Sequence, residues 1–71
     1  MDSCAKRLRH MRKKHGFTQK EISSLLAISQ STYSSYERGE YDIPAWHLLT
    51  LSKIYRTSVD YFLGLDKYFE K

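Results

Sequence analysis

Apolar side chains recur along the chain at intervals of three and four residues, the spacing of one face of an α-helix. The residues that carry this spacing in a first segment, about 3–15, are Cys4, Leu8, Met11 and His15. The same period predicts four more helices, at about residues 19–26, 30–38, 44–56 and 59–63. Their inward-facing residues are expected to be Ile22, Leu25, Leu26, Thr32, Tyr33, Tyr36, Leu48, Leu51, Tyr55, Val59, Phe62 and Leu63. The sequence has no Asn-Gly or Asp-Gly hairpin turn and no convincing strand pattern, so we expect an all-α fold.

Capping residues mark the ends of these helices. Thr18 and Glu21 have the spacing of a capping box, in which a hydroxyl and a glutamate three residues later satisfy exposed amides. Ser29 and Ser58 can cap the third and fifth helices, and Pro44 suits the first turn of the fourth. All three glycines fall at expected helix ends, namely Gly16, Gly39 and Gly64. Capping and periodicity therefore predict the same five helices.

Two of the expected helices, within about residues 19–38, are short and separated by a tight turn. This arrangement is typical of a helix-turn-helix, which presents its second helix to the major groove of DNA. Residues 27–36 carry no charge, which indicates that amide and hydroxyl groups read the bases while charges elsewhere bind the backbone. Between residues 3 and 20 lie seven Lys or Arg and no acid. This basic segment is either an electrostatic surface for phosphate or an ordinary solvated helix face.

The length of 71 residues favours a single domain, residues 1–71, with a small core and a C-terminal tail at 66–71. No apolar run approaches the ~20 residues of a membrane span, and no signal peptide is recognisable. The single cysteine cannot form an internal disulfide, which suits a reducing compartment. We therefore expect a cytoplasmic protein with no membrane partner.

Candidate chemistry is sparse in this sequence. Cys4, His10 and His15 do not form a recognised set of metal ligands, and His47 is expected on the surface of the fourth helix. No Gly-rich phosphate loop, paired acids or nucleophile elbow occurs. We expect no metal, no cofactor, no small-molecule ligand and no enzymatic activity.

Five short segments combine into a longer pattern. They are residues 11–12 (MR), 16–22 (GFTQKEI), 29–39 (SQSTYSSYERG), 43–44 (IP) and 58–65 (SVDYFLGL). Together they resemble the Xre-type helix-turn-helix regulators, the family that includes phage repressors and Cro. The resemblance covers nearly the whole chain and implies a compact five-helix bundle, a lambda-repressor-like DNA-binding domain.

Three positions depart from the pattern of that family. Ser23 and Ser52 stand where alanine is usual, and Ala27 stands at the turn where glycine is common. A left-handed backbone at Ala27 would cost about 1 kcal/mol more than it would with glycine. None of the three residues enlarges a contact between helices, so the expected fold is unchanged.

The resemblance also implies roles for individual side chains. The expected base-contacting residues are Gln30, Ser31, Ser34 and Ser35. The expected backbone-contacting residues are Arg12, Thr18, Gln19, Arg38 and Tyr41. The carboxamide of Gln30 can pair bidentately with adenine, whereas Ser34 and Ser35 carry less information and could be solvated helix surface. Arg12 is implied to pair with Glu37, which either aims Arg12 at a phosphate or only fixes the geometry of the helices.

These residues lead us to expect a transcriptional regulator that binds double-stranded DNA sequence-specifically and reads the major groove with its third helix. We expect this regulator to be a repressor. The alternative is an antitoxin or protein-interaction adaptor built on the same helix-turn-helix scaffold. One recognition helix reads few base pairs, so a homodimer on a two-fold operator is expected.

The apolar residues of the fifth helix and the tail are the expected dimer interface. They are Tyr61, Phe62, Leu65, Tyr68 and Phe69. Two alternatives remain: the tail could fold back over Trp46, and Trp46 itself could cover the edge of the core or belong to an interface.

Overall fold

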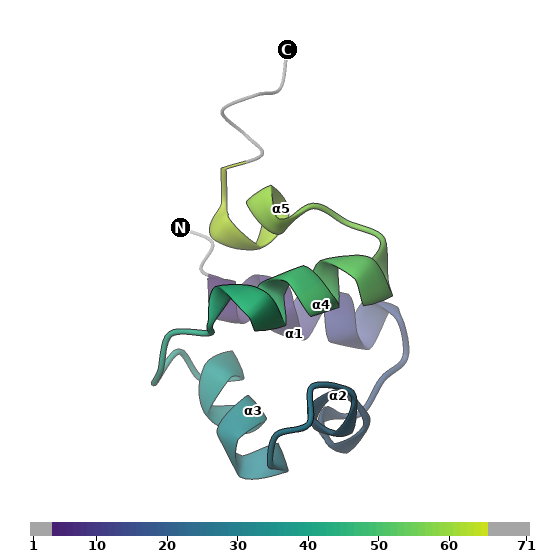
Figure 1. Cartoon of the computed structure of the whole chain (residues 1–71), viewed down its shortest axis with the longest axis vertical. Helices are drawn as coiled ribbons and strands as arrows, with labels where there is room; N and C mark the ends of the chain where they lie inside the picture. The colour runs from purple at the N-terminus through teal and green to yellow at the C-terminus, as the bar shows by residue number, and fades with distance from the viewer. Residues whose placement is uncertain (1–3, 66–71) are drawn as a thin grey trace.

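The computed structural model describes residues 4–65, and Tyr68, Phe69 and the rest of the predicted tail at 66–71 lie outside the described residues. The described chain forms five helices, α1 (Cys4–Lys14), α2 (Gln19–Leu25), α3 (Gln30–Glu37), α4 (Ala45–Tyr55) and α5 (Val59–Leu63). Each begins and ends within one residue of its predicted bounds, and no strand is present between residues 4 and 65. Figure 1 shows α2 and α3 at one end of the molecule, α5 at the other, and α1 and α4 between them.

The predicted caps form as hydrogen bonds. The Thr18 hydroxyl accepts from the Glu21 amide at 3.0 Å, and the Thr18 amide donates to the Glu21 carboxylate at 2.8 Å, which completes the capping box. Ser29 and Ser58 cap α3 and α5 in the same way, each accepting an amide at 3.1 Å. Pro44 lies one position earlier than predicted, at the N-cap of α4. Local sequence signals therefore fix where four of the helices begin.

The core collects residues from all five helices. Its buried apolar members are Leu8, Met11, Ile22, Leu26, Tyr33, Tyr36, Leu48, Leu51, Tyr55 and Phe62. Three residues predicted to face inward are exposed instead, namely Leu25, Thr32 and Leu63. Each is the helical neighbour of a buried residue, and neighbours in an α-helix point about 100° apart, so the neighbour of a core residue can point to solvent.

Two further residues differ from their predicted places. Phe62 was expected in a dimer interface, but none of its surface is exposed, because its ring fills the core beside Tyr55. His47 was expected on the surface, but it is buried on the side of α4 that carries Leu51, one turn later. The ring of His47 lies 6.0 Å from that of Tyr36, so this histidine belongs to the core.

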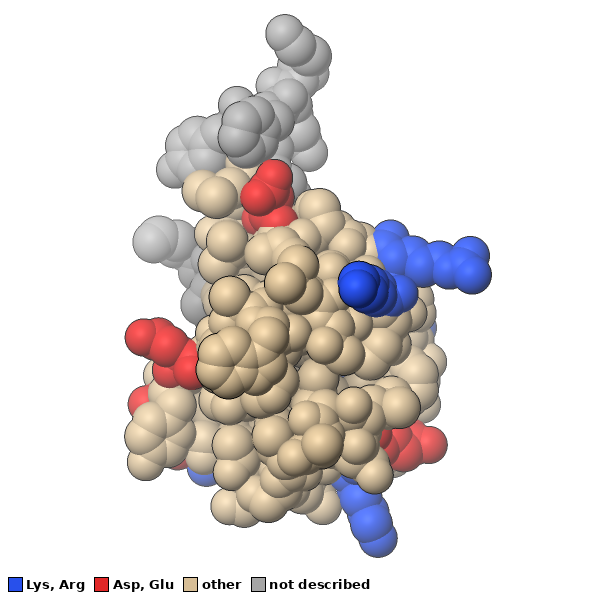
Figure 2. All heavy atoms as spheres, viewed as in Figure 1, with Lys and Arg blue, Asp and Glu red and all other residues tan. Residues whose placement is uncertain are grey.

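The outer side of α4 carries apolar side chains that are not covered. Trp46 is 67% exposed and Leu49 is 53% exposed. Figure 2 shows the face over α4 as largely uncharged, apart from a Lys or Arg side chain over the right-hand part of the face and charged groups at its edges. Trp46 therefore does not cover the edge of the core.

The turn between α2 and α3 has a left-handed residue where it leaves α2. Ala27 has φ of 58°, and the following amide of Ile28 donates to the Ser23 carbonyl at 3.0 Å. Ser23 is itself buried, so its small side chain permits close packing at this corner. Ala27 therefore adopts the left-handed conformation, in a region of backbone angles that favours glycine.

We predict that Ala27→Gly stabilises the protein by about 0.5–1 kcal/mol, because glycine removes the strain of a positive φ. Urea unfolding gives the free energy of unfolding. Ala5→Gly is the matched control: Ala5 lies in α1, where glycine should destabilise by a similar amount. A loss of stability in both variants would show that Ala27 is not strained.

Candidate nucleic-acid interface

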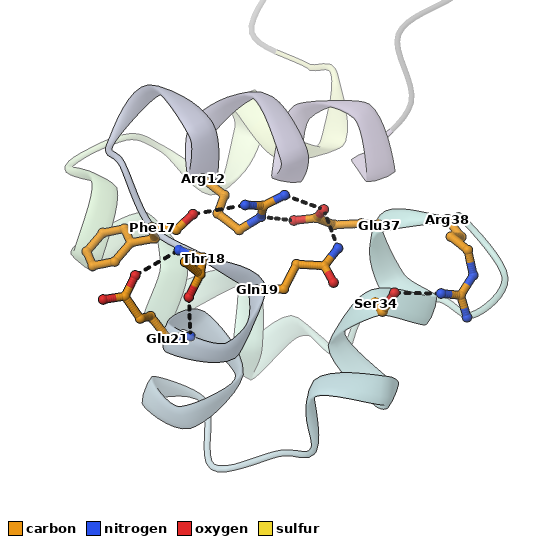
Figure 3. A network of polar contacts seen from close by, with 8 residues as sticks. All are labelled: Arg12, Phe17, Thr18, Gln19, Glu21, Ser34, Glu37 and Arg38. Carbon is orange, nitrogen blue, oxygen red and sulfur yellow. Dashed lines mark hydrogen bonds and ion pairs between the residues drawn. The ribbon is translucent and has the colours of Figure 1, made fainter.

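A charged pair in the middle of the molecule joins three segments of the chain. Arg12, on α1, makes a two-point contact with Glu37 at the end of α3: Nε to Oε2 at 2.7 Å and Nη2 to Oε1 at 3.1 Å. The remaining terminal nitrogen of Arg12 donates to the Phe17 carbonyl at 2.9 Å (Figure 3). The two side chains are only 11% and 4% exposed. The guanidinium thus fixes α1, the entry to α2 and the end of α3 relative to one another.

The same carboxylate holds the first residue of α2. Gln19 donates from Nε2 to Oε1 of Glu37 at 3.0 Å, as Figure 3 shows. Burial raises the pKa of Glu37, but the hydrogen bonds from Arg12 and Gln19 and the positive charge of Arg12 outweigh burial and bring the pKa below its usual range. Glu37 is therefore a carboxylate in neutral solution, and it orients Gln19 at the start of the helix-turn-helix.

A shallow hollow of ≈ 400 Å³ opens between the start of α2 and the outer side of α3. Its lining residues are Gln19, Gln30, Ser31, Ser34 and Arg38. All five belong to the sets predicted from the sequence, three as base contacts and two as backbone contacts. The structure thus brings one part of each set to a single surface.

Arg38 lies over the end of α3 and is engaged on three sides. Its Nη1 donates to the Ser34 hydroxyl at 2.5 Å, and its Nη2 donates to the Ser35 hydroxyl at 3.2 Å. A two-point contact joins it to Glu40, with both distances 3.0 Å. Arg38 and Glu40 are about half exposed, so solvent screens this pair.

The other predicted site residues lie outside the hollow. Ser35 is only 8% exposed, and its hydroxyl donates to the Ser31 carbonyl at 3.1 Å. Thr18 caps α2, and the donors of Arg12 are directed at Glu37 and Phe17. Tyr41 is 68% exposed and lines a separate groove.

Glu40 was missed by reasoning from the sequence. An Arg-x-Glu spacing directly after a helix is the only signal for it, and the same spacing occurs in many exposed loops. What singles out Glu40 is that the loop turns back at Gly39, which has φ of 73°, and carries the carboxylate to Arg38.

Within residues 4–65 no helix is long and apolar enough to cross a membrane. No group of three or more His, Cys, Asp or Glu side chains in that part of the chain is placed to hold a metal ion.

Comparison with known proteins gives a family for this arrangement. Residues 8–62 match the sequence family described as "Helix-turn-helix". The chain is 44% identical over 69 residues to the HTH-type transcriptional regulator ImmR of Bacillus subtilis (strain 168), covering 97% of this chain and 54% of ImmR. It is 39% identical over 59 residues to the uncharacterized HTH-type transcriptional regulator YobD of the same organism, covering 83% of this chain and 53% of YobD. The chain thus spans about half the length of these curated relatives.

Two solved structures share the fold. The P22 c2 repressor protein, crystallised in complex with a synthetic operator, superposes with a TM-score of 0.83 and 32% identity, over 93% of this chain and 100% of that chain. A transcriptional regulator from Listeria innocua superposes with a TM-score of 0.82 and 27% identity, over 87% of this chain and 58% of that chain. The five-helix architecture predicted from the sequence is confirmed.

We predict that Arg12→Ala and Glu37→Ala each lower the free energy of unfolding by roughly 1–3 kcal/mol, because each leaves a buried charge without its partner. The double variant should lose less than the sum of the two. Urea unfolding of all four proteins measures this coupling.

Arg38→Ala and Glu40→Ala provide the matched control, since that pair has the same chemistry but is exposed. Its two changes should have small effects that add. Strict additivity at Arg12 and Glu37 as well would contradict a stabilising role for the buried pair.

Proposed function

The chain belongs to the Helix-turn-helix family, and we propose that it is a transcriptional regulator that acts as a repressor. It binds a specific double-stranded DNA sequence by placing α3 in the major groove. The observation that carries this proposal is the hollow shared by α2 and α3, lined by amide and hydroxyl groups and flanked by a guanidinium. Such groups match the hydrogen-bonding edges of bases, with the charge available to phosphate. The similar structure that was solved in complex with a synthetic operator supports DNA as the partner.

Within this proposal the residues divide into readers and backbone contacts. Gln30 and Ser31 are exposed at the start of α3, and Gln30 has the donor and acceptor that adenine requires. Gln19 and Arg38 border the hollow, where a phosphate would lie beside the bases. The exposed hydroxyl of Thr18 and the exposed ring of Tyr41 are further backbone contacts.

Two residues that the sequence predicted as DNA contacts, Arg12 and Ser35, have supporting roles in the structure that we propose for DNA binding. The donors of Arg12 bind Glu37 and Phe17, so Arg12 acts by holding Gln19 and α3 in place. The hydroxyl of Ser35 is buried and already bonded, so Ser35 supports α3 from within.

The charge distribution supports a nucleic-acid partner. The chain has a net charge of +4, and Arg9, Lys13 and Lys14 are exposed on α1. A positive surface raises the association rate with DNA even where its side chains touch no phosphate. We propose that this activity is cytoplasmic and that residues 1–71 form one DNA-binding domain. DNA binding of this kind requires no catalysis, cofactor or small-molecule ligand.

A protein-interaction adaptor or antitoxin on the same scaffold is the second candidate. The exposed Trp46 and Leu49, on a largely uncharged face, favour it (Figure 2). A mobility-shift titration on the promoter of the chain's own operon, repeated at several salt concentrations, separates the two. A regulator shifts the promoter at lower concentration than random duplex, whereas an adaptor shows equal, weak binding to both.

We further propose that the chain acts as a homodimer. A two-fold axis would place two α3 helices in successive major grooves about 34 Å apart. Of the α5 region, Leu63 and Leu65 are exposed at 52% and 39%, and Tyr61 is half-buried beside Arg7. Tyr61 and Leu65 therefore stay in the proposed interface, Phe62 leaves it, and Leu63 joins it.

The first prediction for DNA binding concerns base readout. Gln30→Ala should cost about 1–3 kcal/mol on the selected site and relax preference at one base pair, because a bidentate contact is lost. Fluorescence anisotropy on selected and random duplexes measures both effects. Equal weakening on the two duplexes would remove Gln30 from the readers.

Two backbone-contact variants provide the controls. Gln19→Ala should weaken binding to selected and random DNA alike, and Arg38→Ala should weaken binding to both duplexes. For Arg38→Ala the slope of log K against log salt should also become shallower by about one unit, since one counterion fewer is released.

The second prediction concerns assembly. Leu65→Asp should disrupt the dimer, because it puts a charge into an apolar contact, and it should lower operator affinity without unfolding the domain. Sedimentation velocity with and without operator counts the chains in each complex. Lys53→Asp, at an exposed position of α4, is a control for an added acid on the surface. One chain per operator, or normal assembly of Leu65→Asp, would contradict this interface.

A further inference from the structure

The hydroxyl of Ser34 has a defined direction that its residue type alone does not give. A serine hydroxyl can donate one hydrogen bond or accept others, so it usually discriminates poorly between bases. Here it lies 2.5 Å from Nη1 of Arg38 (Figure 3). A guanidinium carries only donors, so the Ser34 oxygen must be the acceptor of this bond. The proton of the hydroxyl is then directed away from Arg38.

The hydroxyl of Ser35, in contrast, both accepts and donates a hydrogen bond. It accepts from Nη2 of Arg38 at 3.2 Å and donates to the Ser31 carbonyl at 3.1 Å. Among the described residues, no hydrogen bond has the Ser34 hydroxyl as its donor. Ser34 lines the hollow together with Gln30 and Ser31, so its proton is available to a group that enters there.

Glu40 determines where the guanidinium lies. Its two carboxylate oxygens each accept from Arg38 at 3.0 Å, from Nε and from Nη2. A two-point contact of this kind fixes the plane of the guanidinium, not only its position. In that plane Nη1 reaches Ser34. Because the pair is exposed, it adds little to stability, and its consequence is orientation.

We propose that Glu40 and Arg38 fix Ser34 as a hydrogen-bond donor, so that Ser34 selects a base with an acceptor in the major groove and disfavours cytosine. Guanine, adenine and thymine present N7, O6 or O4 acceptors there, whereas cytosine presents only its N4 amino donor. Opposite cytosine the Ser34 proton would find no acceptor on that base, and the Ser34 oxygen already accepts one bond from Arg38. Arg38 and Glu40 are positioning residues in this readout. The inference rests on the proposed function, since it concerns how that function distinguishes one base pair.

The test begins with selection of a wild-type site from a library of random duplexes. Affinity is then measured for sets of four duplexes that differ at one pair, through the whole site. The wild-type protein should disfavour cytosine at one position by about fivefold or more, the cost of an unmatched donor. Ser34→Ala, Glu40→Gln and Arg38→Lys should each reduce that discrimination towards onefold at the same position. Arg38→Lys retains the positive charge, so its loss of discrimination would come from the lost planar contact.

Two control variants isolate the effect. Asp42→Asn removes an exposed acid from the same loop, and should change affinity for all four duplexes alike. Gln30→Ala should relax preference at a different pair. The combined Ser34→Ala, Glu40→Gln variant should discriminate no less than Ser34→Ala alone, because Glu40 acts through Ser34.

Two results would overturn the inference: Glu40→Gln altering all four duplexes equally, as Asp42→Asn does, or Ser34→Ala still rejecting cytosine. In either case the wild-type protein would retain sequence preference at the pair read by Gln30. If the wild-type protein instead bound every duplex equally, the proposed function itself would have failed.

Discussion

The buried contact between Arg12 and Glu37 is the interaction on which the rest of the structure depends. It joins α1 to the nearby start of α2 and to the end of α3, where Glu37 is 25 residues from Arg12 in sequence. Taking two charges out of water is costly, and the two-point geometry and the extra bonds to Phe17 and Gln19 offset that cost. The pair gives a small domain a fixed angle between its two motif helices, which apolar contacts alone specify less sharply.

The second feature of the molecule is the uncharged outer side of α3. It presents an amide and hydroxyls, groups that can match the donor and acceptor pattern of a base edge. Two arginines near helix ends are held by a partner of opposite sign, Arg12 by Glu37 and Arg38 by Glu40. The buried pair holds three segments of the scaffold, while the exposed pair lies beside Ser34 on α3.

The residues whose burial differs from the sequence prediction share one physical cause. Leu25 and Leu63 are apolar and stand beside buried neighbours, and the sequence does not say which of two neighbours a helix turns inward. His47 is polar by type yet packs against Tyr36, because the rotation of α4 is set by Leu48 and Leu51 on the same side. Helix rotation depends on packing against other helices, which no single segment encodes.

The sequence by itself determined the five helices and their approximate bounds, because caps, glycines and periodicity act over a few neighbouring residues. It also determined the family, whose pattern is a matter of spacing. Only the tertiary structure decided that Gln19 and Gln30 line one hollow. It also decided that the Ser35 hydroxyl donates a hydrogen bond within α3 while the Ser34 hydroxyl donates none among the described residues, and that Glu40 orients Arg38. These depend on where one helix end meets another element, and hydrogen-bond partners are set by angles and distances that sequence spacing does not contain.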